Sequence, residues 1–161
     1  MSYSYYEVYT NALRAFEGLG FPYGADEDSA FIITWLELYN LDGVHLLASN
    51  INKFDQKFDG VIDHINSDNL INLKKKSSLM VAPGIVDYLV SKIKTIDDQI
   101  LVIENCTYPI FFIPLLANLL KKNICSIIRN ANNIVCLIDG NKISISNKLL
   151  KNLEMQQNFS I

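Results

Sequence analysis

The chain has 161 residues, of which 50% are hydrophobic and 19% charged, so it is long enough for one substantial core and short for two. A formal net charge of −3 implies no broad basic surface, and we therefore expect no nucleic acid partner. Three cysteines, an odd number, and no secretory leader at residues 1–5 predict a cytoplasmic location. The most apolar run, residues 109–120, falls far short of the ~20 residues that span a bilayer, so we expect no membrane segment.

The first predicted helix begins at Ser4, because Ser4 and Glu7 have the spacing of a capping box. Apolar residues then recur at helical spacing from Tyr5 to Phe16 and form one stripe. Gly18 and Gly20 are expected to end this helix.

A second helix is predicted after the turn at 20–24, which contains Pro22 between two glycines. The acidic residues 26–28 fall in its first turn, where carboxylates face unpaired N–H groups. The alternative for these carboxylates is a metal or phosphoryl site, but capping is the favoured interpretation. A turn at 40–43 and the apolar residues between Leu46 and Phe54 predict a third helix.

From residue 55 to 69 the sequence is polar and aperiodic, which indicates a connector or a hairpin at Asp59-Gly60. Beyond it the pattern is α/β. The apolar run 79–82, cut off by Pro83-Gly84, predicts a strand, and a helix is predicted over 85–93. Residues 100–103 predict a buried strand.

The later segments predict a turn and helix over 107–122, with the regular helix beginning at Pro114, then a strand over 124–128. Residues 134–138 and 143–145 predict a hairpin, and the tail from Asn147 a short helix. The expected fold class is therefore α/β or α+β. An N-terminal helical unit packs on a small mixed sheet with a C-terminal β-hairpin. We expect one domain over 1–161, with a helical subregion (1–55) and an α/β subregion (70–161).

The segment around Trp35 resembles an uncharacterised bacterial family with a G-x-P-x-G turn followed by a W-L-E motif. The motif stands here as Gly20-Phe21-Pro22-Tyr23-Gly24-Ala25, then Ser29-Ala30, then Trp35-Leu36-Glu37. The likeness is clearest over the first 50 residues. That family has no assigned activity, so the resemblance implies no functional residue.

The same block has a fainter similarity to the N-terminal helices of malate/L-lactate dehydrogenase-like proteins, where a glycine-rich turn leads to a Ser-His-Gly element. The corresponding residues are Leu41-Asp42-Gly43-Val44-His45-Leu46, in which the serine and the second glycine are missing. The resemblance implies a shared helix-pair architecture at most, because a shared fold does not establish a shared activity.

No catalytic residue is predicted outright, and the candidates are Cys106, His45 and Glu104. Cys106 follows a predicted strand in Glu104-Asn105-Cys106, at the carboxyl end where α/β sheets place ligands. A following helix N-terminus would favour its thiolate, but a structural role for this thiol is the leading interpretation. His45 follows a turn and has the spacing of a lone general base or of a surface residue.

The alternative to a purely structural role is a ligand pocket at the predicted strand ends, formed by Ala82, Pro83, Gly84 and Asn105, where a backbone N–H approaches an anion. The chain has no dinucleotide, Walker A or nucleophile-elbow motif, and its cysteines and histidines lack zinc-site spacing. We therefore predict no metal and no cofactor.

The leading functional prediction is an accessory or protein-interaction protein that forms homo-oligomers, homodimers above all. It follows from high apolar and aromatic content beside little site chemistry. The alternative is a small metabolic enzyme or small-molecule-binding protein with its pocket near Cys106.

Overall fold

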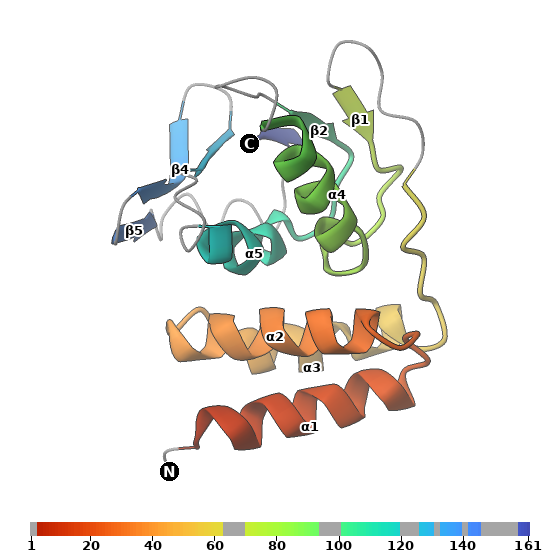
Figure 1. Ribbon diagram of the computed structural model, residues 1–161. Coiled ribbons are helices and arrows are strands. Elements are labelled where there is room, and N and C mark those ends of the chain that lie inside the picture. The colour runs from red at the N-terminus through yellow and green to blue at the C-terminus, as the bar shows by residue number, and fades with distance from the viewer. Residues whose placement is uncertain are drawn as a thin grey trace. The chain divides into compact units, whose positions relative to one another are not determined.

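The computed structural model of the chain describes residues 3–62, 70–93, 101–119, 126–130, 133–139, 142–145 and 158–161. These residues form two compact units, residues 1–59 and residues 60–161, which we describe separately (Figure 1). The boundary lies inside the polar segment 55–69 that the sequence indicates as a connector.

The first unit consists of three helices, α1 (Tyr5–Gly18), α2 (Ala25–Leu38) and α3 (Gly43–Phe54). α1 and α2 lie side by side and run in opposite directions, and α3 packs against α2 (Figure 1). The three predicted helices are thus confirmed, although α3 already begins at Gly43. We call residues 1–59 the helical unit.

The N-terminus of α1 carries the predicted capping box. The Ser4 backbone N–H donates to Glu7 Oε2 over 2.8 Å, and the Glu7 backbone N–H donates to Ser4 Oγ over 3.2 Å. Two N–H groups that the helix leaves unpaired are satisfied in this way.

The C-terminus of α1 ends in a Schellman motif centred on Gly20, which has φ of +81°. The N–H of Phe21 donates to the Phe16 carbonyl and that of Gly20 donates to the Glu17 carbonyl. The rings of Phe16 and Phe21 lie 4.8 Å apart, the apolar contact that usually accompanies this motif.

The end of α3 is tied to the same corner. The Gln56 backbone N–H donates to the Leu19 carbonyl over 2.9 Å, and its side-chain amide donates to the Gly18 carbonyl over 3.3 Å. The ring of Phe58 lies 5.0 Å from that of Phe21. Residues 54–58 therefore close the helical unit on itself.

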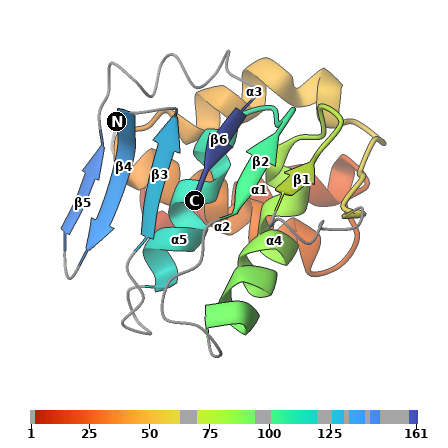
Figure 2. The same cartoon turned by 90° about the horizontal axis from the view of Figure 1, so that it is seen from above.

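The second unit is a six-stranded mixed sheet with helices α4 and α5. Its strands are β1 (Leu70–Asn72), β2 (Val102–Glu104), β3 (Ser126–Asn130), β4 (Asn133–Asp139), β5 (Lys142–Ile145) and β6 (Asn158–Ser160). The spatial order is β1-β2-β6-β3-β4-β5, and only β1 and β2 are parallel. Figure 2 shows α4 and α5 on one face of this sheet.

The helical elements of this unit are α4 (Ser78–Ile93), the short 3-10 helix η1 (Pro109–Phe111) and α5 (Phe112–Asn118). α4 connects the parallel strands β1 and β2, and it packs against η1 and α5. Its buried residues include Leu79, Ala82, Ile85 and Leu89. The expected fold class is confirmed, with a helical unit, a mixed sheet and the predicted hairpin, formed by β4 and β5.

Three predictions for this unit were wrong. Residues 79–82 are not a strand, because α4 runs from Ser78 through Pro83 to Ile93. The regular helix of the 107–122 segment begins at Phe112, two residues before Pro114. Of the tail predicted to be helical, residues 158–160 form the strand β6, while 147–157 lie outside the described residues.

The error at Pro83 has a plain cause. A proline inside a helix removes one backbone hydrogen bond and clashes with the preceding turn, so Pro83-Gly84 in the sequence predicts an element boundary. The apolar spacing nevertheless continues across it, and burial of Leu79, Ala82 and Val86 on one side holds the helix together.

Candidate functional site

The predicted site lies where the parallel strands β1 and β2 end. We call residues 73–78 and 104–108 the β1–β2 edge. Beyond the strands the two segments continue side by side: the Leu73 N–H donates to the Glu104 carbonyl over 2.9 Å, and the Thr107 N–H donates to the Lys76 carbonyl over 3.1 Å. The Ser78 N–H then donates to the Thr107 carbonyl over 3.0 Å.

Four residues of the β1–β2 edge other than glycine have a left-handed backbone. They are Lys74, Lys75, Asn105 and Tyr108, with φ between 50° and 68°. Such residues concentrate at functional sites, but they also occur where tight turns demand them. Here the Lys75 N–H donates to the Asn105 carbonyl over 2.6 Å, so part of this geometry serves to join the two segments.

Cys106 lies at the centre of the β1–β2 edge and is completely buried. Burial raises the pKa of its thiol to about 12, although hydrogen bonds from the Ser78 side chain and backbone act in the opposite direction. The Sγ atom also lies 3.4 Å from the Thr107 carbonyl oxygen. A thiol with this pKa stays protonated near neutral pH, so Cys106 has the environment of a structural side chain.

Ser78 is the polar residue that sequence reasoning missed. It is fully buried, and its hydroxyl donates to the Tyr108 carbonyl. The Leu79 N–H donates to Ser77 Oγ over 3.3 Å, and the Ser78 N–H donates to the Thr107 carbonyl. Two N–H groups at the start of α4 are paired in this way. Two serines before an apolar run are a common helix-start signal, and they could have placed the start of α4 correctly.

The other predicted site residues are not gathered around this thiol. Ala82, Pro83 and Gly84 lie inside α4, where they present no helix N-terminus to a ligand. Glu104, at the end of β2, and Asn105 are partly exposed. His45 is an exposed residue of α3 and belongs to the helical unit.

The described residues contain no group of three or more His, Cys, Asp and Glu side chains that could hold a metal ion. Of the three carboxylates at the start of α2, Asp26 has the predicted role: it is buried, and its Oδ1 accepts from the N–H groups of Gly24 and Glu27, each over 2.8 Å. In the described part of the chain, no helix is long and apolar enough to cross a membrane.

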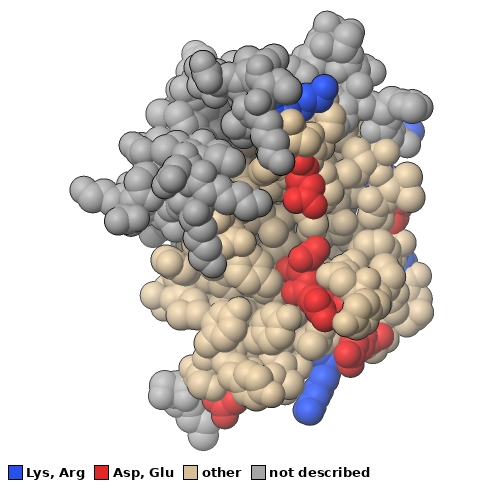
Figure 3. All heavy atoms as spheres, in the orientation of Figure 1, with Lys and Arg blue, Asp and Glu red and all other residues tan. Residues whose placement is uncertain are grey.

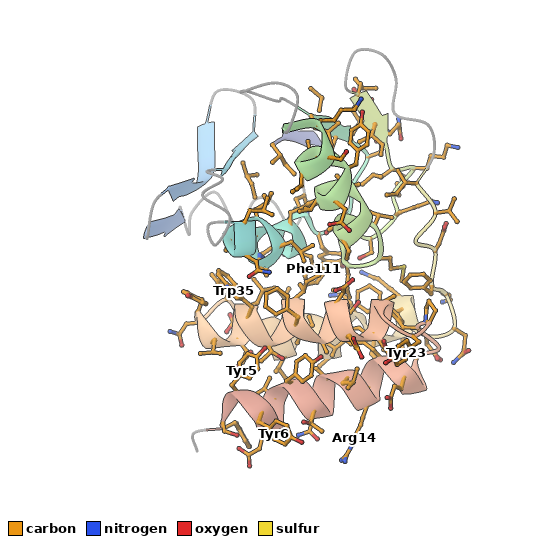
Figure 4. The ribbon with its side chains drawn as sticks, viewed as in Figure 1. Tyr5, Tyr6, Arg14, Tyr23, Trp35 and Phe111 are labelled. Atoms are coloured by element: carbon orange, nitrogen blue, oxygen red, sulfur yellow. The ribbon has the colours of Figure 1, made fainter. Side chains whose placement is uncertain are left out.

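A second candidate site is the surface at one end of the helical unit. Because α1 and α2 are antiparallel, the start of α1 and the end of α2 share this end. We call it the aromatic end; its exposed side chains are Tyr3, Tyr5, Tyr6, Leu38 and Tyr39. Figure 4 shows Tyr5, Tyr6 and Trp35 at this end and Tyr23 at the opposite one.

The aromatic end is partly ordered by ring stacking. Trp35 and Tyr39 stack with their centroids 4.0 Å apart, and Tyr5 and Tyr9 stack at 6.0 Å. Burial, followed by the negative charge of Glu27, raises the pKa of Tyr9. These stacked rings present flat apolar faces with polar tips, the chemistry that is enriched at protein interfaces.

The charged side chains of these two helices are mostly acidic. Figure 3 shows uncharged atoms over much of this surface, interrupted by groups of acidic side chains. Among the residues whose side chains the structure describes, the large exposed apolar ones belong to the helical unit, except Val61. The helical unit therefore presents a surface suited to binding another protein.

Comparison with curated proteins and with solved structures finds no significant match to the chain. The resemblance to malate/L-lactate dehydrogenase-like proteins is not shown by any comparison. Residues 3–81, which include α1, α2, α3, β1 and the start of α4, match the model of the family described as Protein of unknown function (DUF3726), and this confirms the expectation of a family without an assigned activity.

Proposed function

We propose that this chain is an accessory protein that works by binding protein, in the first place other copies of itself, through its helical unit. The observation that carries the proposal is the exposure of Tyr3 and Tyr6, at 70% and 74%, on the aromatic end. Tyrosines of this exposure lose much apolar surface to water on binding, at a low cost in side-chain entropy.

The distribution of burial supports the same proposal. The core of the helical unit is satisfied without these rings, because α1 already buries Ala12 and Phe16 and α2 buries Ile33 and Leu36. The exposed tyrosines therefore contribute little to folding.

Sedimentation velocity over a wide concentration range, down to micromolar, tests the proposal. The unchanged chain is expected to self-associate, and the double substitution Tyr3→Ser with Tyr6→Ser to weaken the association. Tyr23→Ser is the matched control, because Tyr23 is 90% exposed but lies at the other end of the unit. A chain that stays monomeric throughout and retains no protein partner in a pull-down would overturn the proposal.

A second candidate is a small-molecule-binding protein or small enzyme that uses the β1–β2 edge. It is favoured by the left-handed backbone of Lys74, Lys75 and Asn105 at the carboxyl ends of parallel strands. This alternative predicts chemical-shift changes at Asn105 and Glu104 when a library of small metabolites is added, and none at His45.

The buried free thiol of Cys106 supports a cytoplasmic location, where thiols remain reduced.

A further inference from the structure

The outer face of α1 carries a regular row of exposed residues. Glu7, Asn11, Arg14 and Gly18 follow one another at three- and four-residue spacing, so they form one stripe along the helix, and all are exposed. Figure 4 shows Tyr6 and Arg14 on the same side of α1, pointing away from α2. This outer face is therefore open to a partner along the whole length of the helix.

The charges on this stripe are arranged symmetrically about its middle. Glu7 and Arg14 are two helical turns apart, about 10 Å along the axis. In a two-fold symmetric pair, every contact between one residue and another occurs twice. Two α1 helices that cross antiparallel between Thr10 and Asn11 place Glu7 of each copy opposite Arg14 of the other.

The ends of the stripe are also complementary in shape. The same antiparallel crossing brings the start of α1, which the exposed Tyr3 precedes, toward Gly18 of the second copy. Tyr3 is exposed, and the space where Gly18 would carry a side chain contains no atom within 4 Å. The Tyr3 ring of one copy can therefore pack against the backbone at Gly18 of the other, and a side chain at position 18 would prevent this contact.

From this complementarity we infer that the outer face of α1 binds the same face of a second copy, antiparallel, with reciprocal Glu7–Arg14 ion pairs. The inference rests on the proposed self-association and names the surface and the geometry that achieve it. A parallel pair would set Glu7 against Glu7 and Arg14 against Arg14, so charge selects the antiparallel orientation.

The resulting dimer is weak and reversible. Exposed ion pairs contribute little each, and one pair of short helices buries less surface than a permanent dimer needs. Reversing one charge of the stripe turns both attractions into repulsions, so we expect the dimer to weaken about tenfold.

Charge reversal with mixing tests the geometry by sedimentation equilibrium. Arg14→Glu and Glu7→Lys should each weaken self-association about tenfold. An equal mixture of the two variants should restore self-association. In a dimer with one chain of each variant, position 7 of each chain again faces the opposite charge at position 14 of the other. Lys57→Glu, an exposed change outside α1, is the matched control and should leave self-association unchanged.

A second measurement does not depend on Glu7, which also belongs to the capping box. With Asn11→Cys, mild oxidation should link two chains through position 11, whereas Tyr23→Cys should form far less of this product. Circular dichroism confirms that each variant keeps its helices.

The outcomes separate the two claims. If the unchanged chain self-associates but the mixture does not recover and Asn11→Cys does not cross-link, the antiparallel α1 pairing is wrong and self-association stands. If the unchanged chain is monomeric at every concentration, both are overturned.

Discussion

Gly43 lies directly against the backbone of Ile33, so a methyl group added to Gly43 would collide with the Ile33 carbonyl oxygen and lie 2.9 Å from the Glu37 nitrogen. The first turn of α3 can approach α2 this closely only because residue 43 has no side chain. This contact fixes the spacing of two of the three helices.

We predict that Gly43→Ala destabilises the chain by about 3 kcal/mol or more, because its neighbours are backbone atoms that cannot rotate away. Urea denaturation monitored by circular dichroism measures the loss. Gly18→Ala is the control: it meets no atom within 4 Å, and we expect it to be neutral or slightly stabilising. Equal stabilities for the two variants would contradict the close approach of α2 and α3.

The thiol of Cys106 should make stability depend on pH in alkali. Burial raises the folded-state pKa of Cys106 from 9.0 to about 12, so the folded state holds the thiol proton more tightly than the unfolded chain does. The contribution of this proton to the free energy of unfolding is complete below pH 9 and is lost as the pH rises toward 12. The loss should be about 4 kcal/mol. Comparing denaturation of the unchanged chain and Cys106→Ala across this range isolates the contribution of Cys106, and a constant difference between them would contradict it.

The same burial predicts slow reaction of Cys106 with thiol reagents in the native state and fast reaction in denaturant. Mass spectrometry after digestion assigns the modified residue. Rapid native labelling of Cys106 would instead favour the enzyme alternative.

Ser29 is buried, and its hydroxyl has no hydrogen-bond partner among the described residues. Because burying an unpaired hydroxyl is unfavourable, Ser29→Ala should raise the free energy of unfolding by up to about 1 kcal/mol. Thr34→Val is the contrasting variant. It removes a hydroxyl that donates to the Ala30 carbonyl over 2.7 Å, and Ser29→Ala should be the more stable of the two. The reverse order, in thermal denaturation, would refute this account.

The capping box predicts an acid-sensitive start of α1. Hydrogen bonds from the Ser4 backbone and then its hydroxyl lower the pKa of Glu7, so their contribution is present above the ordinary value of 4.5 and is lost as the pH falls through the lowered value. In an NMR titration, Ser4→Ala should move the Glu7 pKa upward and cost about 1 kcal/mol of stability. Ser4→Asn keeps a capping oxygen and should cost less.

The helical unit could be predicted closely because its signals are local. The Ser4–Glu7 box, the glycine at position 20 and the acidic first turn of α2 each act over a few residues, and each is found as expected. A helix end of this kind is decided by its own sequence rather than by distant partners.

The sheet was less predictable, because β1 and β6 are only three residues each and have no period of their own. Their backbone groups are paired by strands far away in the chain, as when the Ile161 N–H donates to the Leu101 carbonyl over 3.1 Å. The environment of Cys106 could not be predicted from its neighbours in sequence for the same reason. Segments far apart in the chain bury the strand-end thiol, and this burial raises its pKa, whereas Ser78, 28 positions earlier, acts in the opposite direction.

Translation adds residues in order, and β6 enters the sheet between β2 and β3, elements more than 25 positions upstream. While the ribosome still holds residue 160, no strand pairs the two halves of the sheet, and their facing edges offer unpaired amides to other chains. The three helices, made earlier and stabilised by neighbours in sequence, can fold by then. The nascent chain thus spends its most aggregation-prone interval just before synthesis of this region ends.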